Sequence, residues 1–164
     1  RDRFKLFLVS LILSLSFAVI PASANLKAPV AFEPSATIDN VIDRAHELLG
    51  TPYKSGGTKV NQGFDCSSFL VYLFKTEANI RLPRTTTEMH RSSAATVQRE
   101  ALKPGDAVFF KGNGRGQVSH VGLYIGKGKF IHSPSTGKRV RIDSLSNSYW
   151  KKHYTTAKRF HTAG

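Results

Sequence analysis

Cys66 is the only cysteine in the 164-residue chain, and it lies in the stretch NQGFDCSSFL at residues 61–70. A single cysteine cannot form a disulfide within its own chain. Asp65 is a favoured helix N-cap, which would place the thiol at the first position of a helix. The helix dipole favours the thiolate there, so we expect a lowered pKa and a reactive nucleophile. A buried structural cysteine is the alternative, because free cysteine packs like a small apolar side chain.

A cysteine nucleophile needs a base within hydrogen-bond reach, and the base needs a group that orients it. Of the six histidines, four lie in segments typical of the surface: His46, His90, His153 and His161. His120 and His132 lie instead in SHVGLYIG and KFIHS, two predicted strands joined by a turn at 126–128. A three-residue loop pairs Gly122 with His132 and puts His120 diagonally opposite on the same face, within about 7–8 Å. A two-residue loop would place the two rings on opposite faces. Gly122 would leave the space between them open.

Zinc binding is the competing interpretation of a Cys/His/His set, because three such ligands and a water can form a catalytic zinc site. The cysteine lies far upstream of both histidines, and the chain has no second cysteine and no HExxH motif. A serine nucleophile at Ser67 or Ser68 is less favoured beside a thiol. We therefore expect no metal and no other cofactor.

Helical spacing of apolar residues predicts the elements that position these groups. A first helix is expected from Thr37, as N-cap, to Gly50, as C-cap. A second helix should begin at Asp65, with residues 53–64 forming a loop before it. Thr85 and Glu88 fit a capping box, so a short third helix should follow there.

Beyond the third helix the pattern changes to strands. They are expected at 107–110, 119–126, 129–133, 138–142 and 155–160, with a helical turn within 145–150. Val121, Leu123 and Ile131 should face a core covered by the helices. Helices followed by an antiparallel sheet predict an α+β fold, with the N-terminal helices packed on a central antiparallel β-sheet.

The first 24 residues have the layout of a secretory signal peptide: basic residues, an apolar run over 6–20, and Ala22-Ser23-Ala24 before the cut. A membrane anchor is the alternative, but the run is shorter than the ~20 residues that span a bilayer. We therefore expect a signal peptide at 1–24, a linker at 25–36 and one domain at 37–164. The chain should be secreted or periplasmic, with no stable membrane anchor after cleavage.

The formal net charge of +13 favours an anionic partner. For an exported protein, anionic polymers of the cell envelope are the expected partners. Simple solubility is the alternative, because the lysines and arginines are scattered. Nucleic acid binding is not expected, since no basic helix or RNA-binding aromatic motif occurs. We expect a monomer.

Six motifs, in order, resemble the NlpC family of bacterial cell-wall cysteine peptidases, which are rearranged relatives of papain. They span residues 37 to about 160. The motifs are Tyr53-x-x-Gly56-Gly57, Gly63-Phe64-Asp65-Cys66-Ser67, Leu82-Pro83-Arg84-Thr85, Leu102-x-Pro104-Gly105-Asp106-x-Val108-Phe109-Phe110, Ser119-His120-Val121-Gly122-x-Tyr124-x-Gly126 and Phe130-Ile131-His132.

This resemblance implies a papain-like fold and an exported cysteine endopeptidase that hydrolyses amide bonds in peptidoglycan stem peptides or cross-links. Cys66 would be the nucleophile, His120 the general base and His132 the residue that orients His120. Two other functions stay open: a catalytically silent wall-binding module, and an amidase or acyltransferase of the same superfamily.

The resemblance also implies roles around the cleft. The Tyr53 hydroxyl would help to hold the oxyanion, and Asp65 and Ser67 would be helix cap and cleft wall. Arg84 would pair with a carboxylate, either that of Asp65 or that of the substrate. Two departures from the family pattern affect the expected substrate fit: Ser68 stands where glycine is usual, and Ser55 where a large aromatic residue is usual.

Overall fold

The computed structural model describes residues 34–112 and 116–161. The predicted signal peptide and most of the predicted linker lie outside these residues. The described helices are α1 (Pro34–Glu47), α2 (Cys66–Ala78), α3 (Thr86–Arg91), the short 3-10 helix η1 (Arg99–Ala101) and α4 (Ser148–His153). Among these residues, no helix combines the length and the apolar character that crossing a membrane requires.

Two of the three predicted helix starts are confirmed. Asp65 caps α2, and its carboxylate accepts a hydrogen bond from the Ser68 amide. Thr85 caps α3 in a complete capping box with Glu88. Helix α1, in contrast, begins three residues before the predicted cap at Thr37 and ends before Gly50, which has a φ of +85° in the following turn.

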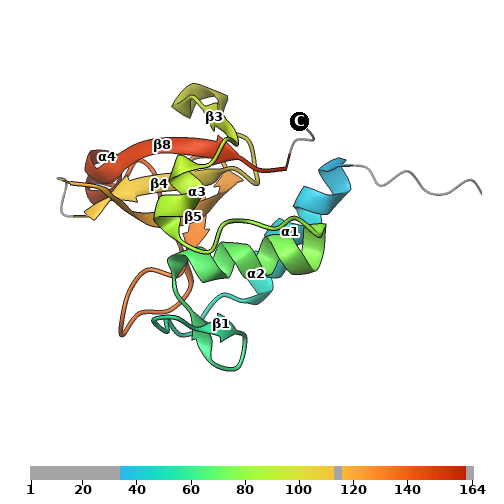
Figure 1. The fold of residues 1–164 in the computed structure, drawn as a ribbon. Coiled ribbons are helices and arrows are strands. Elements are labelled where there is room, and N and C mark those ends of the chain that lie inside the picture. Colours follow the sequence, from blue (N-terminus) through green and yellow to red (C-terminus); the bar gives the residue numbers. More distant parts are fainter. Residues whose placement is uncertain (1–33, 113–115, 162–164) are drawn as a thin grey trace, which may run out of the picture. The chain divides into compact units, whose positions relative to one another are not determined.

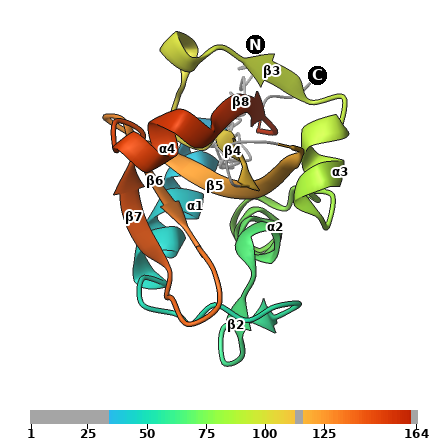
Figure 2. The same cartoon turned by 90° about the vertical axis from the view of Figure 1, so that its left-hand side faces the viewer.

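A six-stranded antiparallel sheet, in the order β3-β8-β4-β5-β6-β7, forms the centre of the domain (Figures 1 and 2). The predicted fold class is therefore confirmed. The strands are β3 (Ala95–Val97), β4 (Ala107–Lys111), β5 (Val118–Gly126), β6 (Lys129–His132), β7 (Arg141–Ser144) and β8 (Tyr154–Arg159).

Five further elements differ from the prediction: β1, β2, β3, β7 and α4. Residues 53–64 include a two-stranded sheet of β1 (Thr58–Lys59) and β2 (Gly63–Phe64), rather than a loop alone. Strand β3 was not predicted, because it buries only Val97 and is held by backbone pairing with β8. Strand β7 and helix α4 each begin three residues later than predicted. No side chain of β7 is fully buried, so its apolar alternation is weak.

The two faces of the sheet pack against different helices. On one face, Val121, Leu123 and Ile131 join the main core with apolar residues of α1 and α2. On the other face, Phe110 and Phe130 form a second core that is covered by Trp150 of α4. The predicted orientation of β5 and β6 is confirmed, and the histidine-bearing face is covered as well.

The β5–β6 turn sets the register of the two histidines. Gly126 pairs with Lys129, so the loop holds only two residues, both with positive φ, and not the three predicted. The register shifts at Ile125, and this additional residue in β5 compensates for the shorter loop. Leu123 therefore still lies opposite Ile131, and the parity needed for the histidines is kept.

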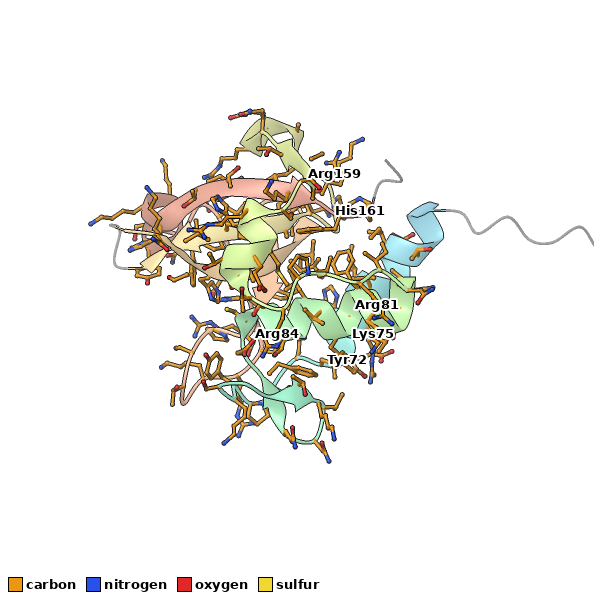
Figure 3. All side chains as sticks on the ribbon, viewed as in Figure 1. Tyr72, Lys75, Arg81, Arg84, Arg159 and His161 are labelled. Carbon is orange, nitrogen blue, oxygen red and sulfur yellow. The ribbon has the colours of Figure 1, made fainter. Side chains whose placement is uncertain are left out.

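The proline-glycine-aspartate turn before β4 is anchored by a buried ion pair. Asp106 is fully buried, and Arg159 at the end of β8 donates two hydrogen bonds to its carboxylate, both of 2.7 Å. Figure 3 shows the position of Arg159 on β8. This pair joins β4 to β8, and its position indicates a structural role for the motif.

Candidate active site

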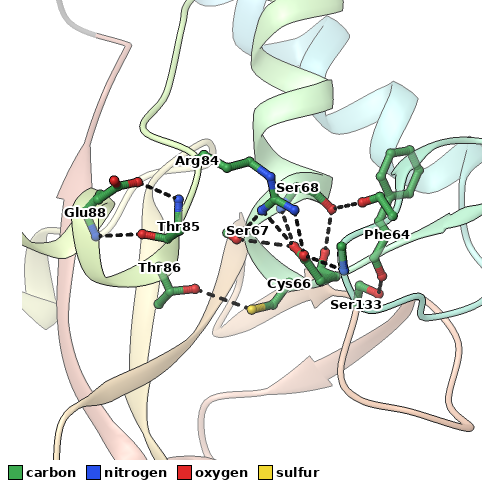
Figure 4. A network of polar contacts seen from close by, with 12 residues as sticks. Phe64, Cys66, Ser67, Ser68, Arg84, Thr85, Thr86, Glu88 and Ser133 are labelled. Atoms are coloured by element: carbon green, nitrogen blue, oxygen red, sulfur yellow. Dashed lines mark hydrogen bonds and ion pairs between the residues drawn. The ribbon is translucent and has the colours of Figure 1, made fainter.

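Cys66 is the first residue of α2, as predicted, and its sulfur lies where three elements meet. The Sγ atom is 3.4 Å from Thr86 Oγ1 on α3 (Figure 4). It is 4.0 Å from the carbonyl oxygen of Ser119 on β5. The thiol is only partly buried. It is therefore held against the strand that carries His120.

The prediction of a lowered thiol pKa is wrong for the resting site. Burial raises the pKa of the Cys66 thiol, and the negative charge of Asp65 acts in the same direction. Hydrogen bonds from Thr86 and from the Val121 and Ser67 backbone oppose this shift but do not outweigh it. The thiol therefore starts protonated and needs a base to become a nucleophile.

The two predicted histidines are in direct contact. His120 Nε2 lies 2.7 Å from His132 Nδ1. Trp150 stacks on His120, with ring centroids 5.5 Å apart, and meets His132 edge-on. Burial lowers the pKa of His120 to about 3 and that of His132 to about 4, so both rings are neutral at pH 7.

Gly122 matters here for a different reason from the one expected. A Cβ atom at this position would lie 2.7 Å from Phe130 Cδ2 and 3.3 Å from His132 Cβ. The space beside Gly122 is thus filled by these two side chains rather than left open. The glycine allows them to pack tightly against β5.

Asp143 is a member of this group that the sequence reasoning missed. Its Oδ2 atom lies 2.7 Å from His132 Nε2 and 2.8 Å from Arg141 Nε. Burial alone would raise the pKa of Asp143, but hydrogen bonds from Arg141 and His132 outweigh it and the pKa is lowered. The two-residue period of the strands could have revealed it, because Asp143 pairs with Phe130 and so lies on the same face of the sheet as His132.

Arg84 pairs with Asp65, one of the two carboxylates predicted for it. Its guanidinium donates to both oxygens of Asp65, at 2.7 and 3.2 Å, and to Ser67 Oγ at 3.0 Å (Figure 4). Burial would raise the pKa of Asp65, but Arg84 and the Ser68 amide lower it. This cluster holds the first turn of α2, and with it the thiol, in place.

The backbone of Tyr53 forms an isolated bridge with Phe64, two residues before Cys66. Burial raises the pKa of the Tyr53 hydroxyl, and the nearby Cys66 and Asp65 raise it further. The hydroxyl therefore stays protonated and can donate a hydrogen bond. Ser68, one departure from the family pattern, is buried and donates to the Gly57 carbonyl at 2.6 Å. This bond ties the loop at Gly57 to the first turn of α2.

The remaining histidines lie outside this group. His46 is exposed, as predicted, and bonds to the carbonyl of Ile42. His153 was predicted at the surface, but it is buried and stacks on Tyr149. The prediction failed because α4 turns this residue inward, although lysines precede it. His90 and His161 are partly buried.

A cavity of about 500 Å³ adjoins His120 on the side of α4 and β7. Lys111 and Arg141 bring positive charge to its wall, and the half-exposed Tyr149 provides an aromatic surface. Asp143 is the acidic residue of this wall, and it is already bonded to Arg141. The arrangement suits a peptide that carries a carboxylate. Within residues 34–112 and 116–161, no three His, Cys, Asp or Glu side chains are grouped as metal ligands would be.

Comparison with known proteins is consistent with this geometry. A chain from Escherichia coli named murein DD-endopeptidase MepH is 47% identical over 122 residues, covering 74% of this chain and 45% of that protein. Probable peptidoglycan endopeptidase LytE of Bacillus subtilis is 43% identical over 126 residues, covering 77% and 35%. A crystal structure of an NlpC/P60 family protein from Bacillus cereus superimposes with a TM-score of 0.71 at 36% identity, covering 76% and 40%.

This chain spans less than half the length of each of these three proteins. The model of the NlpC/P60 family matches residues 50–159, which include the thiol, both histidines and Asp143. The match covers more than half of the chain and contains all six motifs that carried the resemblance. The chain belongs to the NlpC/P60 family.

Proposed function

We propose that this protein is a cysteine endopeptidase that hydrolyses amide bonds in peptidoglycan stem peptides or their cross-links. The observation that carries the proposal is the placement of Cys66 at the start of α2, against the strand whose His120 contacts His132. The names of the relatives support the substrate class, since MepH and LytE are a murein and a probable peptidoglycan endopeptidase.

In this proposal, neutral His120 takes the proton from the Cys66 thiol as the sulfur attacks the amide carbonyl. A neutral base fits a thiol whose pKa is raised by burial, because neither group is charged before the substrate arrives. The protonated His120 then gives its proton to the leaving amine, and a thioester remains. Water attacks the thioester with His120 again as base, which releases the acid and restores the thiol.

The oxyanion formed by this attack would be held by two donors. One is the backbone amide of Cys66, which lies in the first turn of α2 and has no acceptor within the helix. The other is the Tyr53 hydroxyl, which stays protonated. A single donor of this kind is typically worth about 3 kcal/mol of activation barrier.

The cavity beside His120 would receive the leaving-group side of the peptide. His120 must reach the leaving amine, and the cavity adjoins this ring on the side of α4. Lys111 and Arg141 would bind carboxylates of the stem peptide, and the net charge would hold the protein near anionic envelope polymers. No cofactor enters the mechanism.

Mass spectrometry of purified muropeptides tests the proposal. New stem-peptide fragments should appear with the wild-type chain and not with Cys66→Ala, and their masses identify the bond. Cys66→Ser keeps the shape of the site, but its cleavage rate should be at least about a hundredfold lower. A serine hydroxyl is much harder to deprotonate than a thiol and is therefore a weaker nucleophile here. If neither wild type nor variant yields fragments from several wall types, the silent wall-binding module is favoured. Acyl transfer to an added amine would favour the acyltransferase.

We also propose that the protein acts in the cell envelope after removal of residues 1–24. The support is the layout of those residues together with the envelope substrates in the names of the relatives. N-terminal sequencing of the exported protein should begin at Asn25. Light scattering and a DNA-binding assay test the predicted monomer and the predicted lack of nucleic acid binding.

A further inference from the structure

We propose that Asp143 is a positioning residue that decides which ring nitrogen of His120 carries the proton. The inference rests on the proposed function only in taking His120 as the base for Cys66. It concerns a proton arrangement, so it can be tested without any substrate.

The position of the proton on His120 follows from which atoms donate and which accept in the hydrogen bonds that join Asp143, His132 and His120. Asp143 is ionised and can only accept, so His132 must donate through Nε2 at 2.7 Å. His132 is neutral, so its Nδ1 atom carries no proton and must accept. The partner of this Nδ1 is His120 Nε2 at 2.7 Å, which must therefore donate. The second nitrogen of His120, Nδ1, is left with a free lone pair.

That lone pair is what the proposed base needs. In the opposite tautomer, His120 would carry its proton on Nδ1 and present an N–H group, which cannot accept the proton of Cys66. The choice between tautomers is made two hydrogen bonds away, at a residue that touches neither the thiol nor the base. Asp143 would also stabilise the positive charge that His120 gains when it takes the proton.

Arg141 fixes the orientation of the acceptor. Its Nε atom donates to Oδ2 of Asp143, the same oxygen that accepts from His132. An arginine N–H can only donate, so whatever replaces Asp143 must turn an acceptor towards Arg141 to keep this contact. His132 is fully buried, whereas the Asp143 side chain is 24% exposed on the cavity wall. A water that replaced the carboxylate could donate or accept a hydrogen bond, so it would not fix the tautomer as the carboxylate does.

Two substitutions separate positioning from mere structural support. Asp143→Asn should keep the His120 tautomer, because Arg141 turns the amide oxygen into the place of Oδ2 and the amide nitrogen away. Asp143→Ala removes the acceptor, so both tautomers should be populated. When Asp143→Asn is combined with Arg141→Met, the new amide group is free to turn, so the double variant D143N/R141M should also mix the tautomers.

Nitrogen-15 NMR of the full chain at pH 7 reads the tautomer directly, with His120→Asn identifying the signals. We expect an unprotonated Nδ1 on His120 in the wild type and in Asp143→Asn, and mixed signals in Asp143→Ala. The rate of Cys66 alkylation by iodoacetamide should fall at least about tenfold in Asp143→Ala, since the base contributes ~10²–10⁴-fold to such steps. The fall in Asp143→Asn should be smaller.

If Asp143→Ala does not fold, the double variant D143N/R141M takes its place. Its His120 tautomer and alkylation rate are then compared with those of Asp143→Asn. A protonated Nδ1 on His120 in the wild type would overturn the proposal. So would an unchanged tautomer and alkylation rate in Asp143→Ala and in D143N/R141M. None of these readouts uses peptidoglycan, so a failure here is distinct from a failure to cleave muropeptides.

Discussion

Two neutral histidines, His132 fully buried and His120 partly buried, should make the protein much less stable in mild acid. In an unfolded chain a histidine has a pKa of about 6.5. Burial lowers the pKa of His120 to about 3 and that of His132 to about 4 in the folded protein. Between pH 6.5 and about 4 the unfolded chain therefore binds protons that the folded chain does not. The free energy of unfolding must fall as the pH falls through this window.

The magnitude follows from these shifts. Each such histidine costs about 1.4 kcal/mol of stability for every pH unit below about 6.5. At pH 4.5 the two histidines together should have cost about 5 kcal/mol, a large part of the ~5–15 kcal/mol typical of a folded domain. Asp65 and Asp143 have pKa values lowered below 3.8, so they titrate below this window.

Urea unfolding at pH 7 and pH 4.5, followed by circular dichroism, measures this difference. The double variant His120→Asn/His132→Asn should lose most of the pH dependence, although it starts from a lower stability. His46→Asn is the matched control: His46 is exposed, and its replacement should leave the wild-type fall intact. A wild-type fall below about 1 kcal/mol, or an equal fall in the double variant, would show that these two histidines do not stay neutral in the folded protein.

Three other substitutions test separate contacts. Gly122→Ala places a Cβ atom 2.7 Å from Phe130 Cδ2 and should destabilise the protein by about 1–3 kcal/mol in urea unfolding; an unchanged midpoint would contradict this packing. Arg84→Met removes a bidentate partner that is 41% exposed, so thermal unfolding should show a loss of only about 1 kcal/mol, together with slower alkylation of the thiol. Lys111→Ala should raise KM severalfold for muropeptides with free carboxylates and leave kcat unchanged, whereas Lys75→Ala, on α2, should change neither.

Features that depend on neighbours in sequence were predicted well. The start of α2 follows from Asp65, whose short carboxylate reaches the amide three residues later, and the start of α3 follows from its capping box in the same way. The facing of Val121 and His120 to opposite sides of β5 follows from the two-residue period of a strand. These are local properties, so no knowledge of the fold was needed.

For the turn between β5 and β6, the predicted pairing of the two strands is correct, but the predicted loop length is wrong. The loop is one residue shorter than predicted, and an irregularity at Ile125 compensates for it. Strand pattern alone does not reveal such a bulge, because it depends on how both strands pair. His153 is a similar case, since its burial depends on how α4 packs.

The order of residue types is enough to predict the reactive groups of this protein: one thiol behind a helix cap, two histidines on one face of a hairpin, and motifs that identify the family. The electrostatics of the site, in contrast, depend on how the chain folds. Folding partly buries the thiol, which raises the pKa that the helix terminus alone would lower. It also brings Asp143 from β7 to within 2.7 Å of His132. Desolvation and contacts between distant segments arise only when the chain is folded, so residue types and spacing could not reveal them.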